Sequence, residues 1–304
     1  MCCLFGLIDC QNSLSAKQKN GLLLALAAAS EARGTDATGI AYNVGGKLQV
    51  YKRPWAGRFM QFRVPVESRA VMGHTRYATQ GSAKRNYNNH PFCGEIDGLT
   101  FALAHNGIIH NDIALQKNLP KTRIKTDSYV AVQLLEKSRI LNLESLKSMA
   151  EQVQGSFVFT ILDQHDSLYF VKGNNPLCIY FFPKFKLYIY NSTEEILLNA
   201  LSGVNLYLGK PETIMLQDGD ILELCPDGTL HAGQFQPAPF PDLTSWNWHG
   251  WPYDWECAPA SNTYLESLKE IAPSLGYTPE AIEILFQRGF TPEEIEDVLY
   301  GVRP

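Results

Sequence analysis

The chain has 304 residues, 45% hydrophobic and 19% charged, which is typical of one large or two ordinary globular domains and excludes a disordered or collagen-like chain. The net charge is −5 without a run of Lys and Arg, so we expect neither nucleic acid nor a membrane surface as a partner. The longest apolar stretch, 22–29, is far shorter than the ~18 residues of a membrane span.

The seven cysteines show no paired CxxC spacing, which indicates reduced thiols rather than a disulfide framework or a zinc ribbon. The chain also does not begin like a secretory signal. We therefore expect a cytoplasmic protein that needs no cofactor and no metal.

In the first half of the chain, apolar runs of strand length precede polar segments that contain histidine. A two-residue turn at Gly45-Gly46 predicts a hairpin. The expected strands cover 2–8, 39–43, 47–52, 70–72 and 99–104, and the expected helices cover 22–32, 128–137 and 141–152.

The second half is richer in short strands, with turns at Asp218-Gly219 and Asp227-Gly228. The order of the elements leaves few βαβ repeats, and this predicts an α+β fold in which antiparallel sheets are sandwiched by helices. The expected strands cover 157–163, 168–172, 178–182, 187–190, 213–217 and 221–225, with a helix at 194–201.

The C-terminal part differs in composition from the rest. Residues 236–258 hold four of the five tryptophans and four prolines, which is typical of a linker, and 259–304 hold eight acidic against three basic residues. We therefore divide the chain into a domain (1–235), a linker (236–258) and an acidic helical tail (259–304). The tail is either a lid on the domain or a docking module for a partner.

A short repeat in the tail, 276–283 and 289–296, predicts two helices. In each copy a threonine (Thr278 or Thr291) can cap the helix that the following proline begins. Six apolar residues at helical spacing are expected in the core of the tail: Ile282, Leu285, Phe286, Ile295, Val298 and Leu299.

The second residue could carry chemistry. Removal of Met1 would leave Cys2 with both a thiol nucleophile and a free α-amine, whose pKa of roughly 8 suits a base near neutrality. Taken alone the signal is weak, because a cysteine near an N-terminus is more often a buried apolar residue.

Three polar segments could complete a site. Arg76, in a glycine-bounded segment at 73–81, can capture a carboxylate, or form an ordinary surface salt bridge. Asn106 and Gly107, at the expected end of a strand, can donate to an oxyanion, or form an Asn-Gly turn. Asp127, before a helix, can pair with an ammonium group or cap the helix.

Six segments resemble, in order, the motifs of class II (N-terminal nucleophile) glutamine amidotransferases, and the resemblance extends over about 2–230. A further segment, 172–177, resembles the glucosamine-6-phosphate synthase branch, and the glutaminase domain is most similar to that of this enzyme and of amidophosphoribosyltransferase. The six segments are MCCLFG (1–6), RGTDATGIA (33–41), GHTRYATQG (73–81), NHP (89–91), HNGII (105–109) and TD (126–127).

The resemblance implies a four-layer αββα sandwich and L-glutamine as the substrate. Cys2 would attack the side-chain amide, and Asn106 with the Gly107 N–H would stabilise the oxyanion. Arg76 and Thr79 would bind the substrate's α-carboxylate, and Asp127 its α-ammonium group. Hydrolysis of the resulting glutamyl thioester would give glutamate.

The sequence departs from the family pattern at Cys3, where glycine is usual, and at Gln80, which replaces a histidine of the sugar-phosphate branch. It also lacks an acceptor domain, so we expect ammonia to pass to a synthetase subunit on another chain. Two alternatives remain open: a catalytically silent glutamine-sensing regulator, and a hydrolase of another γ-glutamyl amide.

Overall fold

The computed structural model describes residues 2–237 and, in the tail, 265, 268–269, 272–275, 277–287, 295 and 298–299. The chain forms two compact units, Met1–Pro241 and Asp242–Pro304. Most of the expected linker, 238–258, lies outside the described residues. No helix in the described part of the chain is both long enough and apolar enough to cross a membrane.

The first unit contains two sheets in which every neighbouring pair of strands is antiparallel. The first sheet has the order β11-β9-β10-β1-β4-β2-β3, with β1 in its middle. Its strands are β1 (Cys3–Asp9), β2 (Ala37–Val44), β3 (Lys47–Arg53), β4 (Ala70–Arg76), β9 (Cys178–Phe182), β10 (Leu187–Asn191) and β11 (Glu212–Ile214).

The second sheet has the order β13-β12-β8-β7-β6-β5. Its longest strand, β6, runs beside β7 over nine residue pairs. The strands are β5 (Phe92–Ile96), β6 (Leu99–Ile109), β7 (Gly155–Asp163), β8 (Leu168–Lys172), β12 (Asp220–Leu224) and β13 (Leu230–Gln234).

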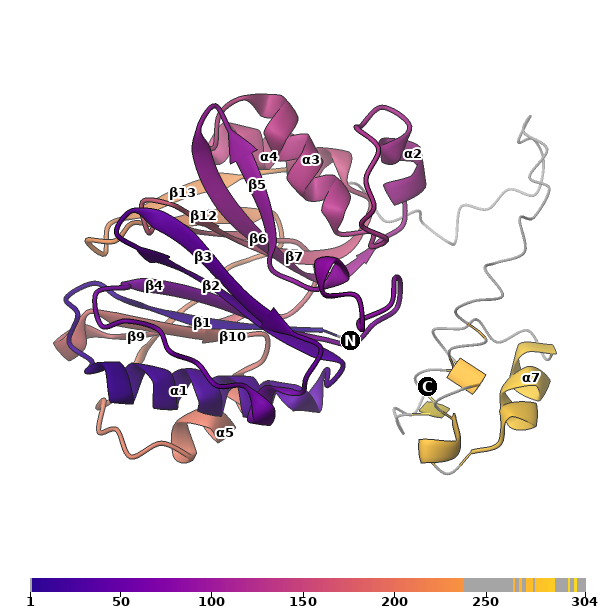
Figure 1. Cartoon of the computed structure of the whole chain (residues 1–304), viewed down its shortest axis with the longest axis horizontal. Helices are drawn as coiled ribbons and strands as arrows, with labels where there is room; N and C mark the ends of the chain where they lie inside the picture. The colour runs from indigo at the N-terminus through magenta and orange to yellow at the C-terminus, as the bar shows by residue number, and fades with distance from the viewer. Residues whose placement is uncertain are drawn as a thin grey trace. The chain divides into compact units, whose positions relative to one another are not determined.

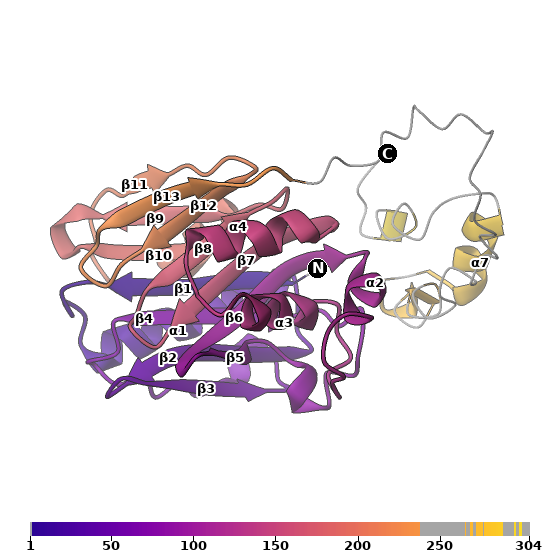
Figure 2. The same cartoon turned by 90° about the horizontal axis from the view of Figure 1, so that it is seen from above.

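The two sheets lie face to face, and helices cover their outer faces (Figure 1). Helices α1 (Ala16–Ala29) and α5 (Glu194–Ser202) pack on the first sheet, and α3 (Tyr129–Ser138) and α4 (Leu143–Gln152) on the second. Three apolar clusters fill the spaces between these layers. The predicted α+β fold with four αββα layers is therefore confirmed. A short helix, α2 (Asp112–Gln116), follows β6 (Figure 2).

Strand β1 shows how the sequence builds these layers. Successive side chains of a strand point to opposite faces of its sheet. Leu4 and Ile8 accordingly join the cluster between the two sheets, whereas Phe5 and Leu7 join the cluster beneath α1. A continuous apolar run is therefore required here, because both faces of β1 are covered.

Helix α1 begins six residues earlier than the sequence analysis expected. Ser15 and Gln18 form a capping box at its start. Lys19 is fully buried in the first turns, where its Nζ donates to the carbonyls of Val66 and Ser68 at 2.8 and 2.7 Å. The prediction missed this turn because a lysine normally indicates a solvent-exposed position. The carbonyls that allow Lys19 to be buried belong to residues far away in the sequence.

Strands β4 and β6 are longer than predicted. The expected strands ended at 72 and 104, but β4 continues through Arg76 and β6 through Ile109. Their polar residues lie inside the sheets rather than in loops after them. Strands β5 and β13 were not predicted at all, whereas the Gly45-Gly46 turn is confirmed by positive φ angles of 56° and 71°.

The tail unit has a small apolar core of its own. Helix α7 (Pro279–Gln287) begins where the first repeat copy predicted, and the Thr278 hydroxyl accepts the Ala281 N–H at 3.3 Å. Phe286 is 38% exposed, so its assignment to the core was wrong. The cap at Thr291 lies outside the described residues. The buried members of this core are Leu265, Leu268, Ala272, Ile282, Ile295 and Leu299.

Candidate active site

Cys2 lies at the entrance to β1, the strand in the middle of the first sheet. Its Sγ–H donates to the Tyr77 carbonyl at 3.5 Å, and its own carbonyl accepts the Arg33 Nε–H at 3.0 Å. Burial raises the pKa of the Cys2 thiol. A buried thiol of this kind stays protonated at neutral pH, so it needs a base to become a nucleophile.

Cys3 points away from Cys2 because neighbouring residues of a strand alternate between faces. The Cys3 Sγ–H donates to Asn191 Oδ1 at 3.0 Å, and the Asn191 amide donates to the Ser30 hydroxyl at 3.0 Å. Cys3 is fully buried among these groups. A residue larger than glycine therefore fits at this position without crowding the Cys2 thiol.

Arg76 is the last residue of β4, and it is only 3% exposed. Its guanidinium donates to Asn89 Oδ1 at 2.7 Å, to the Gly81 carbonyl at 2.8 Å and to the Gln80 carbonyl. The alternative of a surface salt bridge is wrong, since Arg76 is buried and makes no ion pair with any described carboxylate. A buried cation normally has an anionic partner. Arg76 is therefore a buried cation whose charge no described carboxylate balances through an ion pair.

Asn106 and Gly107 lie within β6, so the alternative of an Asn-Gly turn is wrong. Asn106 is buried, its Oδ1 has no hydrogen-bond partner among the described residues, and its Nδ2 makes only a long 3.5 Å contact with the Ser192 hydroxyl. Gly107 has a φ of +143°, and a Cβ there would lie 1.9 Å from the Ser156 carbonyl oxygen. Only glycine fits this position.

Asp127 precedes helix α3 and is 6% exposed. Its Oδ2 accepts the Ile109 N–H at 2.8 Å, and its Oδ1 accepts the Ser128 hydroxyl at 3.2 Å. Ser128, not Asp127, occupies the N-cap position, so the capping alternative is wrong. Thr79 is half-buried, and its side chain makes no hydrogen bond within the described part of the chain.

Charge and hydrogen bonding connect these residues across the two sheets. The guanidinium of Arg76 lowers the pKa of the Cys2 thiol and the carboxylate of Asp127 raises it, although burial has the larger effect on that pKa. Ser192 accepts the Leu4 N–H at 2.8 Å and also contacts Asn106, which links β1 to β6. Sequence reasoning missed Ser192, which stands after an ordinary strand with no motif around it.

The comparisons with known proteins agree with this geometry. Residues 74–198 match the family model described as a glutamine amidotransferase domain. The chain is 31% identical, over 219 residues, to the glutamine–fructose-6-phosphate aminotransferase of Aquifex aeolicus, covering 69% of this chain and 34% of the relative. The corresponding protein of Thermus thermophilus is 30% identical, covering 65% and 32%. The chain carries a class II glutamine amidotransferase domain. It spans about a third of the length of these relatives.

Solved structures give the same fold. The glutamine phosphoribosylpyrophosphate amidotransferase of B. subtilis superimposes with a TM-score of 0.61 at 19% identity, covering 77% of this chain and 49% of that one. A structure described as the allosteric regulatory enzyme of purine biosynthesis has a TM-score of 0.62 at 20% identity, covering 77% and 49%. The amidotransferase domain therefore has the fold of the N-terminal nucleophile enzymes.

Three histidines are buried in the amidotransferase domain, in the segments that carry Arg76, Asn89 and Asn106. His74 Nε2 is 3.0 Å from the His105 carbonyl oxygen, and the His74 and His90 rings stack with 4.1 Å between their centroids. Burial lowers the pKa of His74 to about 3 and lowers those of His90 and His105. All three are therefore neutral at pH 7. Each lies in a segment that carries the family resemblance, but the sequence alone did not show that they meet.

These histidines make the domain sensitive to acid. In the unfolded chain a histidine binds a proton below about pH 6.5, whereas folded His74 does so only near pH 3. The free energy of unfolding is therefore unaffected above pH 6.5 and falls as the pH drops below it. One such histidine costs about 2 kcal/mol between pH 7.5 and 5. Denaturant unfolding followed by circular dichroism measures this loss.

The variant His90→Leu tests how much one buried histidine contributes to the loss of stability at low pH. Neither His90 ring nitrogen has a hydrogen-bond partner among the described residues, so leucine leaves no group unpaired. We expect the variant to lose less stability than the wild type on acidification. His165→Gln, at an exposed position, should not differ from the wild type. An equal pH dependence in all three proteins would contradict the assignment.

Proposed function

We propose that the chain is a glutaminase subunit, which hydrolyses L-glutamine to glutamate and ammonia through a glutamyl thioester on Cys2. The observation that carries this proposal is the buried Arg76 guanidinium without an ion-pair partner among the described residues, placed where both it and Asp127 act on the Cys2 thiol. An amino acid supplies the matching charges: an α-carboxylate for Arg76 and an α-ammonium group for Asp127. The family match and the names of the relatives support glutamine as that amino acid.

The chemistry begins when Met1 is removed and the α-amine of Cys2 becomes free. The amine takes the thiol proton, and Sγ forms a bond to the amide carbon of glutamine. The negative charge that develops on the amide oxygen is stabilised by Asn106 Nδ2, whose only described contact is a long one, and by the Gly107 N–H. The C–N bond then breaks, and the proton held by the amine leaves with ammonia.

Water completes the cycle. It attacks the thioester carbon, the C–S bond breaks, and glutamate departs as Cys2 regains its proton. In this scheme Arg76 and Thr79 hold the substrate's α-carboxylate while Asp127 holds its α-ammonium group. The remaining Arg76 donors are available for this, because its described hydrogen bonds use one Nη1 and both Nη2 hydrogens.

We further propose that ammonia passes to an acceptor synthetase on another chain. The described cysteines are all unpaired, which supports a reducing, cytoplasmic location. The division into a glutaminase domain (1–235), a linker (236–258) and an acidic tail (259–304) belongs to the same proposal. The charge of the tail supports its role as a docking module for a basic surface.

Ammonia release by the purified full-length chain tests the proposal. Intact mass first establishes that Met1 is absent. Glutamate dehydrogenase coupling then measures ammonia from L-glutamine, D-glutamine and L-asparagine, and the absorbance of released p-nitroaniline measures cleavage of γ-glutamyl-p-nitroanilide. We expect turnover of L-glutamine, with D-glutamine inert because it would exchange the positions of the two charged groups. Binding of glutamine without turnover would favour a sensor, and faster cleavage of the anilide would favour a hydrolase of other γ-glutamyl amides.

A further inference from the structure

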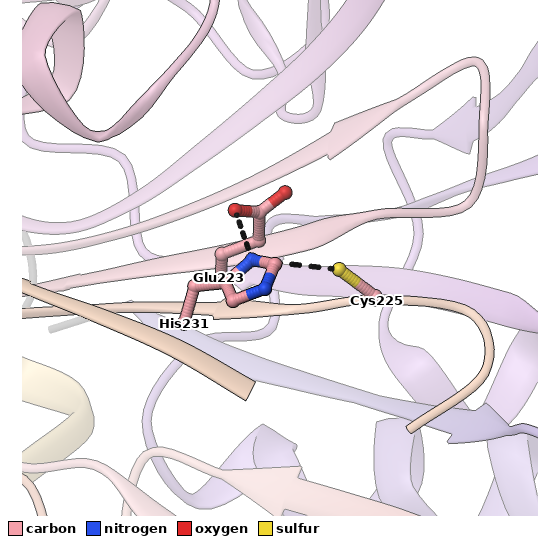
Figure 3. A group of neighbouring side chains, drawn as sticks. All are labelled: Glu223, Cys225 and His231. Atoms are coloured by element: carbon pink, nitrogen blue, oxygen red, sulfur yellow. Dashed lines mark hydrogen bonds and ion pairs between the residues drawn. The ribbon is translucent and has the colours of Figure 1, made fainter. Parts of the chain in front are cut away.

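A second group of reactive side chains lies on the β12–β13 hairpin. Glu223, Cys225 and His231 each direct one ligand atom toward the others, and these atoms all lie within 4.8 Å of one another (Figure 3). His231 Nδ1 is 3.1 Å from Glu223 Oε2 and 3.9 Å from Cys225 Sγ. A carboxylate, a thiol and an imidazole in this arrangement are the ligand types of a transition metal.

The register of the hairpin places these three residues together. Glu223 is directly paired with His231 across the two strands. Cys225 is two residues beyond Glu223, so its side chain leaves the same face. Leu222 and Leu224, on either side of Glu223, are buried on the opposite face, against the core. The cluster is therefore on the outer face of the sheet, away from the apolar interior.

The turn holds the ligands in place before any ion binds. The Cys225 N–H donates to the Thr229 carbonyl at 2.9 Å, and the Gly228 N–H donates to the Cys225 carbonyl at 2.9 Å. The Thr229 N–H donates to Asp227 Oδ1 at 2.8 Å. A metal site on a rigid hairpin loses little conformational entropy on binding.

The two separations from His231 Nδ1 suit zinc. Bonds of about 2.3 Å to sulfur and about 2.0–2.2 Å to nitrogen and oxygen, at tetrahedral angles, place N and S about 3.5 Å apart and N and O about 3.4 Å apart. The observed 3.9 and 3.1 Å each differ from these by less than about half an ångström. Rotation of the side chains alone can supply such a change.

Charge and access also favour a cation. Carboxylates gather at the site: Glu223 belongs to the cluster, and Asp227 is held in the adjoining turn, where it accepts the Thr229 N–H. The His231 side chain is 54% exposed and that of Glu223 is 19% exposed. An ion can therefore enter from solvent, and water can complete its coordination.

We propose that Glu223, Cys225 and His231 form a binding site for a divalent transition metal of the zinc class. The Glu223 carboxylate, the Cys225 thiolate and His231 Nδ1 are the protein ligands, and the thiol proton is released to solvent when the metal binds. The sequence analysis expected no metal because no CxxC pair is present. The site instead depends on β13, a strand that the sequence did not predict. This inference does not rest on the proposed glutaminase activity.

The experiment titrates the full-length chain, stripped with a chelator, with cobalt(II) as a probe and with zinc(II) against a chromophoric competitor. We expect one equivalent of cobalt to produce the near-ultraviolet absorption of a thiolate–cobalt bond. Cys225→Ser should abolish this absorption, and His231→Ala or Glu223→Gln should weaken zinc binding about 10-fold or more. Zinc should raise the melting temperature of the wild type but not of Cys225→Ser.

Two control variants identify the thiol involved. Cys93→Ser removes an exposed cysteine from β5, at the other edge of the same sheet, and should leave the absorption unchanged. Cys2→Ala should also retain the cobalt absorption, whereas Cys225→Ser should retain ammonia release. Failure of the metal-site proposal can therefore be distinguished from failure of the glutaminase proposal. Absorption that persists in Cys225→Ser, that disappears in Cys93→Ser, or that is absent from the wild type would overturn the proposal.

Discussion

Replacing Cys2 by alanine should abolish glutamate formation and leave glutamine binding largely intact. The thiol forms the bond to substrate, whereas Arg76 and Asp127, which carry the charges that match glutamine, remain in place. Calorimetry of glutamine binding and the coupled ammonia assay, both on the full-length variant, separate the two effects. Loss of binding together with activity would mean that Cys2 shapes the pocket rather than performing the chemistry.

Covalent labelling tests the same assignment in the wild type. A glutamine-like electrophile such as diazo-oxo-norleucine should attach to Cys2 alone. Cys3 is fully buried on the opposite face of β1, and burial raises the pKa of Cys10 to about 11, so neither offers an accessible thiolate. Peptide mapping that finds the label on Cys3 or Cys10 would refute the role of Cys2.

Replacing Asn106 by alanine should lower kcat by ~100-fold or more, as the loss of an oxyanion donor does in other enzymes. The fold should tolerate the change, because the side chain makes only the 3.5 Å contact with Ser192 and its Oδ1 has no described partner. Steady-state kinetics with glutamine measure the effect, and unfolding experiments verify that the variant is folded.

Asn199→Ala is the matched control, since this exposed asparagine lies on α5, which covers the outer face of the first sheet. It should leave both kcat and KM unchanged. If Asn106→Ala raises KM and leaves kcat unchanged, Asn106 positions the substrate in the ground state and does not stabilise the transition state.

Local sequence predicted most of the second half of the chain. Strands β7 to β10 and helix α5 lie within a residue or two of their expected bounds, and glycines with positive φ occupy the Asp-Gly turns. These elements combine an apolar period with turn residues at their ends, so short-range patterns contain the information. The order of the motifs along the chain likewise indicates the family, because each motif is a short run of neighbouring residues.

The site residues themselves required the tertiary structure. The sequence contained Arg76, Asn106 and Asp127, but it predicted two of them in or beside loops. For each residue taken alone it also offered an ordinary structural role: a surface salt bridge, a turn and a helix cap. The extensions of β4 and β6 removed the first two alternatives, and the N-cap position of α3, which Ser128 occupies, removed the third. A polar run becomes a buried strand only when neighbouring strands supply its hydrogen bonds, and those neighbours are distant in sequence.

The sequence by itself thus determined the α+β class and the family and singled out the candidate site residues, because each depends on residues that are close together in the chain. Only the tertiary structure decided that Arg76 is buried without a described carboxylate partner, that three buried histidines are neutral, and that Glu223 pairs with His231. Each of these facts follows from the pairing of strands. Pairing is set by the burial of apolar faces across the whole domain, which no single segment specifies.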